Sequence, residues 1–85
     1  MNSILLPTLQ KFIDTKYKKV FDLLSQQSFD EVDDIEIKLK FQIDVKLAPF
    51  KKRKGFKELQ NIIFGYAIVK REITYLEASK KWQRN

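Results

Sequence analysis

The residues from Asp34 to Leu47 alternate between polar and apolar side chains without an exception, which limits the possible folds more than any other feature of the chain. Every odd-numbered position from Ile35 onwards is apolar, and every even-numbered position from Glu36 to Lys46 is polar. Side chains of a β-strand point alternately to opposite faces of a sheet, so this pattern predicts one long, half-buried strand. Its buried face would carry Ile35, Ile37, Leu39, Phe41, Ile43, Val45 and Leu47.

A strand on its own leaves a row of backbone donors and acceptors unpaired, so the predicted strand needs a partner. One source is a second copy of the chain, with the strands of two chains pairing in a homodimer. The other source is the continuous apolar run from Ile62 to Val69, which is rich in branched residues. The spacing of apolar residues around this run also fits a helix, so both assignments stay open.

Helical spacing precedes the strand. Apolar residues from Ile4 to about Ser25 recur every three or four positions, which predicts an amphipathic helix that covers the apolar face of the strand. The segment from Ser25 to Asp34 is polar and acidic, and it is expected to form a solvated loop. Ser28 and Glu31 have the spacing of a capping box, so one short helical turn fits there.

The C-terminal part is expected to form a helix or a pair of helices. A helix is predicted over about Lys57–Arg71, and it either continues to Trp82 or ends near Ile73. The second possibility arises because a capping box formed by Thr74 and Glu77 would start a new helix.

As two helices joined by a turn, residues 65–82 resemble the first two helices of a helix-turn-helix unit. The residues that would face inward are Ala67, Ile73 and Ala78. Because the sequence stops at Asn85, we expect no recognition helix to follow and enter the major groove of DNA.

The fold class that these elements predict is α+β, with residues 1–85 as a single small domain. The chain has no cysteine and no histidine, which excludes disulfides, the usual Cys/His zinc sites and histidine-based acid–base catalysis. No spacing marks a nucleophile and its base, and the acidic residues near position 30 lack the pattern of a calcium loop. We therefore expect no enzymatic activity, no metal and no cofactor.

The longest apolar run, Ile62 to Val69, is eight residues long and is interrupted by Gly65, whereas a membrane-spanning helix needs about 20 apolar residues. We expect a soluble, cytoplasmic protein that does not contact a membrane. The chain is rich in Lys, Ile and Phe and poor in Gly and Pro, as expected of an AT-rich genome such as that of a low-GC bacterium, a phage or a mobile element.

The net charge of +6 is unevenly distributed along the chain. Residues 1–36 contain four basic and seven acidic residues, a net charge of −3, whereas residues 37–85 contain thirteen basic and four acidic residues, a net charge of +9. A surface of this sign attracts nucleic acid or an acidic protein surface.

The most suggestive functional stretch follows Pro49, where five basic residues fall within seven positions. Basic side chains neutralise phosphates, and exposed aromatic rings stack on unpaired bases. Phe50 and Trp82 are the candidate stacking residues, although both would also serve as core residues. The candidate nucleic-acid-binding residues are Lys51, Lys52, Arg53, Lys54, Lys57, Lys70, Arg71, Lys80, Lys81 and Arg84.

These features predict a small basic binding protein that contacts nucleic acid, as an accessory subunit of a replication or transcription machine. The alternative is a protein–protein interaction subunit or inhibitor that acts by strand addition or dimerisation, without nucleic-acid contact. In both cases the chain is expected to be a homodimer or a subunit of a larger complex.

Overall fold

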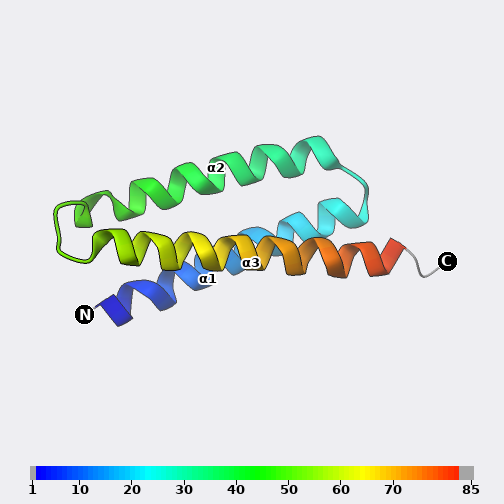
Figure 1. Ribbon diagram of the computed structural model, residues 1–85. Coiled ribbons are helices and arrows are strands. Elements are labelled where there is room, and N and C mark those ends of the chain that lie inside the picture. The colour runs from blue at the N-terminus through cyan, green and yellow to red at the C-terminus, as the bar shows by residue number, and fades with distance from the viewer. Residues whose placement is uncertain (1, 83–85) are drawn as a thin grey trace.

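The computed structural model describes residues 2–82, with side chains from Leu6 to Trp82, and it consists of three helices joined by short turns (Figure 1). They are α1 (Asn2–Ser25), α2 (Phe29–Leu47) and α3 (Phe56–Trp82), and a short 3-10 helix, η1 (Ala48–Phe50), follows α2. The described residues contain no β-strand, so the fold is all-α and the predicted α+β class is wrong. The bundle is elongated, with extents of 50 × 20 × 16 Å.

Helix α1 lies at the centre of the core, because it packs against both other helices. α1 and α3 run in the same direction, and α2 runs antiparallel to both (Figure 1). α2 and α3 make few contacts with each other, so the core is formed mainly where α1 meets each of them. The buried residues of α1 recur every three or four positions and are Leu9, Ile13, Tyr17, Val20 and Leu24.

The segment that was predicted to be a strand forms most of α2. Successive residues of an α-helix are about 100° apart, so positions four apart share a face and positions two apart lie on nearly opposite faces. Strict alternation therefore places two apolar stripes on opposite sides of one helix. The inner stripe, which packs into the core, contains Ile35, Leu39, Ile43 and Leu47. The outer stripe, which faces solvent, contains Ile37, Phe41 and Val45.

Several features of α2 favour a helix over a strand. A helix satisfies its own backbone hydrogen bonds, whereas the sequence offers a lone strand no clear partner. The segment contains no glycine or proline, and acidic residues in its first turn and Lys46 in its last turn complement the helix dipole. Pro49 follows α2 within η1, and Gly55, at φ +85°, directly precedes α3.

The acidic segment that was predicted to be a loop belongs mostly to α2. The turn between α1 and α2 is short, because the backbone of Gln27 takes a left-handed conformation with φ 61°. The amide of Ser28 then donates to the carbonyl of Leu23 at 2.8 Å, which closes the end of α1. Ser28 precedes the first residue of α2 but makes no side-chain capping hydrogen bond.

Helix α3 is continuous over 27 residues, so of the alternatives left open for this part of the chain, the helix that continues to Trp82 is confirmed. Residues 62–69 lie within it, so they do not form a strand, and no turn separates two helices of a helix-turn-helix type. Thr74 does not cap a new helix: its side chain is buried and its hydroxyl donates to the carbonyl of Lys70 at 2.8 Å. Of the residues expected to face inward, Ala78 is buried, whereas Ile73 is 45 % exposed.

Candidate interaction surfaces

The connection between α2 and α3 carries the strongest concentration of positive charge. Four exposed cations of this connection and one in the first turn of α3 lie at one end of the bundle, and we call these five residues the basic end. None of them forms an ion pair within the described residues. Their positive charge is therefore available to an anionic partner. The basic end consists of Lys51, Lys52, Arg53, Lys54 and Lys57.

Phe50 lies at the base of this connection and is partly buried. The guanidinium carbon of Arg53 lies 5.2 Å from the centre of the Phe50 ring, which is a cation–π distance. The ring of Phe50 therefore packs against a side chain of the basic end. Arg53 occupies one ring face, so that face is not free to stack on a base.

The structure does not bring the other candidate basic residues to the same place. Lys57 and Lys80 are separated by most of α3, which corresponds to about 35 Å at 1.5 Å per residue. Lys70 forms an ion pair with Asp14 of α1 at 3.4 Å. Lys81 lies over the ring of Phe21, 5.6 Å from its centre. The predicted positive surface is therefore divided between the two ends of one copy.

Trp82, the second candidate for stacking, is at the opposite end of the bundle from Phe50. Its ring packs edge-on against Phe29 of α2, with 5.7 Å between the ring centres. Its indole nitrogen is buried without a hydrogen-bond partner. Trp82 thus contributes to closing this end of the core. Arg84 lies outside the described residues.

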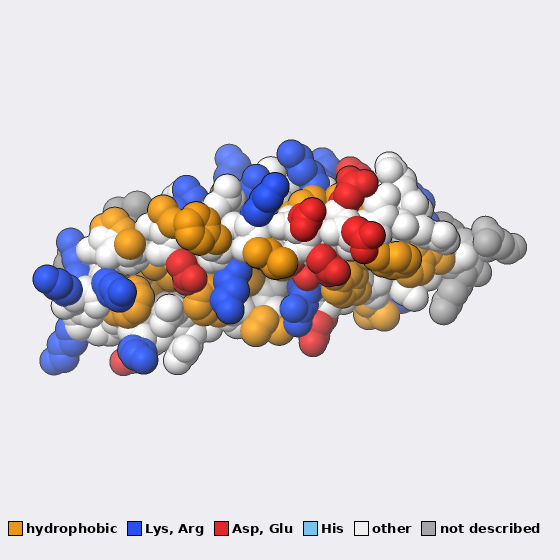
Figure 2. Space-filling view, turned by 90° about the horizontal axis from the view of Figure 1, so that it is seen from above, with side chains coloured by type: hydrophobic (Ala, Val, Ile, Leu, Met, Phe, Trp, Pro, Cys, Tyr) orange, Lys and Arg blue, Asp and Glu red, His pale blue; other side chains and the backbone are white. Residues whose placement is uncertain are grey.

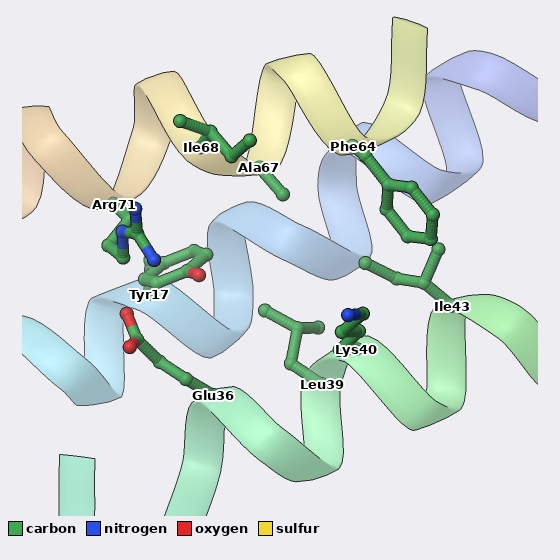
Figure 3. Close-up of a pocket in the computed structure, with 9 residues that line it drawn as sticks. All are labelled: Tyr17, Glu36, Leu39, Lys40, Ile43, Phe64, Ala67, Ile68 and Arg71. Carbon is green, nitrogen blue, oxygen red and sulfur yellow. The ribbon is translucent and has the colours of Figure 1, made fainter. Parts of the chain in front are cut away.

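A groove runs between α2 and α3, with α1 as its floor (Figure 3). It exists because α2 and α3 scarcely touch, and its volume is about 340 Å³. Leu39, Ile43 and Phe64 give it apolar walls. Glu36 and Arg71 extend towards each other near the Tyr17 ring, so Arg71 faces an acidic group rather than open solvent.

Three titratable groups have raised pKa values: Glu36 and Tyr17, which line the groove, and Tyr66, which lies outside it. Burial raises the pKa of the Glu36 carboxyl, and Arg71 and the Tyr75 hydroxyl oppose the increase. Burial, with the charge of Glu36, raises the pKa of Tyr17 to about 12. Burial and a hydrogen bond donated to Asp14 raise the pKa of Tyr66 to about 12. These two tyrosines therefore stay protonated at neutral pH, which makes them poor general bases or nucleophiles.

Exposed apolar side chains form the second type of surface. The outer stripe of α2 is 54–69 % exposed at Ile37, Phe41 and Val45. Figure 2 views the molecule from the α2 side and shows exposed apolar side chains among charged ones. Basic side chains gather at the end where α2 and α3 are joined, and acidic ones gather towards the other end.

The sequence analysis did not predict the exposed outer stripe of α2. The strand assignment placed all seven apolar residues on one buried face. The spacing of four within each stripe was the available signal. The outward apolar residues of α3 were missed because neither assignment of the run from Ile62 to Val69, helix or strand, was divided into an inward and an outward face. Three of its residues are in fact exposed: Ile62, Ile68 and Val69.

Two types of site are not found in the described part of the chain. Residues 2–82 hold no group of three or more acidic side chains placed to coordinate a metal ion. No described helix combines the length and the apolar character needed to cross a bilayer.

Comparisons with known proteins give no match. No protein-family model, no curated protein sequence and no solved structure is significantly similar to this chain.

Proposed function

We propose that the protein is a non-enzymatic binding protein whose basic end contacts nucleic acid. The observation that carries this proposal is the exposure of five neighbouring cations, none of which is paired with an acidic side chain in the described structure. Lysine and arginine side chains of this kind bind phosphates and release counterions. The absence of histidine supports a role without catalysis.

The test is the salt dependence of binding to single-stranded and duplex oligonucleotides, followed by fluorescence anisotropy. A variant with Ala at Lys51, Lys52, Arg53 and Lys54 should bind more weakly. The slope of log affinity against log salt should fall in magnitude by about three, since each lost phosphate contact removes roughly 0.7 to 0.9.

A matched control removes the same charge elsewhere on the surface. It replaces four lysines that are exposed on α1 and α2 with Ala and should keep most of the salt dependence. Absence of binding near physiological salt, or equal losses in both variants, would contradict the proposal. The four lysines are Lys18, Lys19, Lys38 and Lys40.

A role in protein–protein assembly is the second candidate, and the exposed apolar faces of α2 and α3 favour it. Solvent-exposed apolar patches are typical of interaction surfaces. Strand addition is excluded as the mode of binding for the described residues, because they form no strand. Assembly through a helix face is what the geometry supports.

A further inference from the structure

The outward face of α3 carries a line of apolar residues that are about half exposed. The exposed fractions of Ile62, Val69, Ile73 and Leu76 are 45–58 %, and Gly65 lies among them. Exposed charged residues continue the line at both ends. We call these seven residues, spaced three or four apart, the seam: Glu58, Ile62, Gly65, Val69, Ile73, Leu76 and Lys80.

The seam is symmetric about Val69. This residue is also the midpoint of α3, thirteen positions from Phe56 and thirteen from Trp82. Every other member of the seam has a counterpart at the same distance on the other side. The counterparts are Gly65 and Ile73 at four residues, Ile62 and Leu76 at seven, and Glu58 and Lys80 at eleven.

We propose that the seam binds the seam of a second copy, with the two α3 helices antiparallel and a two-fold axis at Val69. An antiparallel copy reverses the order of residues, so Ile62 contacts Leu76 of the second copy and Val69 contacts its own equivalent. This surface is self-complementary, as a two-fold interface requires. The proposal goes beyond the proposed function and does not depend on nucleic-acid binding.

The charges at the ends of the seam favour the antiparallel direction. Glu58 lies beside Lys80 of the second copy, and the symmetry repeats this pair at the other end. A parallel pair would instead bring Glu58 next to Glu58 and Lys80 next to Lys80. Opposite charges that flank an apolar seam are known to set helix orientation in coiled coils.

Gly65 supports the same register independently. A Cβ at this position would meet nothing within 4 Å, so packing within one copy gives no reason for a glycine. Glycine is also among the least favourable residues inside a helix. In the antiparallel pair, Gly65 faces Ile73 of the second copy, and its missing side chain leaves the hole that this isoleucine fills.

The seam is the longer of the two exposed apolar surfaces. From Ile62 to Leu76 it extends about 21 Å, whereas the outer stripe from Ile37 to Val45 extends about 12 Å at 1.5 Å per residue. The apolar area remains small, so we expect a dimer that dissociates in roughly the micromolar range.

This arrangement reunites the basic residues that one copy keeps apart. In this register, Lys81 of the second copy lies level with Lys57, and Lys80 of the second copy lies level with Glu58. Both are within about two helical turns of the loop that carries Lys54. Each end of the dimer then presents the basic end of one chain together with the last turn of α3 from the other.

Sedimentation equilibrium without nucleic acid tests the interface. The unmodified chain should shift from monomer to dimer with concentration, and Val69→Glu should weaken dimerisation at least tenfold, because two carboxylates would meet at the axis. Phe41→Glu on α2 is the matched control and should leave dimerisation unchanged. A monomeric wild-type chain up to about 500 micromolar, or a larger effect of Phe41→Glu, would overturn the proposal.

Charge exchange tests the direction of the helices. Glu58→Lys and Lys80→Glu should each weaken the dimer, and the double variant should restore it, since each new Lys then faces a new Glu. Because the chain has no cysteine, single cysteines provide a second readout. Val69→Cys should form a disulfide-linked dimer and Ile62→Cys should not. Efficient cross-linking at Ile62 would indicate a parallel pair and contradict the proposed register.

Discussion

The two stripes of α2 contain the same kinds of residue but lie in opposite environments. Ile43 in the inner stripe is 1 % exposed, whereas Ile37 in the outer stripe is 69 % exposed, although both are isoleucines on one helix. Their burial differs only because six positions turn the helix far enough to change the face. The type of side chain thus shows that a residue can be buried in a core. Its angular position around the helix axis decides whether it is buried.

The largest expected effect is a difference in stability between two equivalent truncations. Ile43→Ala should reduce the free energy of unfolding by about 3 kcal/mol, because it removes buried apolar atoms and leaves a cavity. Ile37→Ala should change it by no more than about 0.5 kcal/mol. Urea denaturation monitored by circular dichroism measures both values. Similar losses in the two variants would mean that the outer stripe is covered in solution.

Alkaline pH should lower the free energy of unfolding through Tyr17, a buried residue of α1. The pKa of Tyr17 is raised to about 12 in the folded chain from an ordinary value of 10, so the folded state favours the neutral hydroxyl. Its contribution to stability is therefore complete below pH 10 and is lost as the pH rises towards 12, by up to about 2 kcal/mol.

Tyr17→Phe isolates this effect from the other groups that titrate in the same range. The stability difference between the variant and the unmodified chain should change in favour of the variant between pH 9 and pH 11.5. A difference that stays constant with pH would show that Tyr17 is not buried from solvent.

The smallest effect concerns the outward face of α3, where helix propensity rather than packing should decide stability. Gly65→Ala adds a methyl group into open space and should stabilise the monomer by about 1 kcal/mol. For a domain of this size, the melting temperature of a sample dilute enough to be monomeric should rise by roughly 4–8 °C. A decrease would indicate that this face is packed within a single copy.

The sequence allowed the helices at both ends of the chain to be predicted but not the helix between them. The spacing of apolar residues in α1 predicted its C-terminal end at Ser25, as observed. For α2, period-two alternation is compatible with a half-buried strand and with a helix that is apolar on two sides. The missing partner strand, the absence of glycine and proline and the charges in the first and last turns favoured the helix, and these are weaker signals than perfect alternation.

The candidate surfaces were predictable in composition but not in placement. The loop from Lys51 to Lys54 is exposed, as its charge suggests, because a run of cations has no place in a core. The relation of this loop to Lys80 depends on whether the helix continues to Trp82, which the sequence left open. The groove was not predictable either, because it exists only where α2 and α3 make few contacts, and the sequence does not show how closely two helices pack.

The sparse contact between α2 and α3 has a consequence for the order in which the native structure opens. α2 is held mainly by α1, so it can detach while α1 and α3 stay packed together. Such a partial opening costs less free energy than complete unfolding. Amide hydrogens of α2 should then exchange with solvent deuterium faster than those in the middle of α1 and α3. The bundle would behave as a helix pair with a third helix that closes over Tyr17 and reopens.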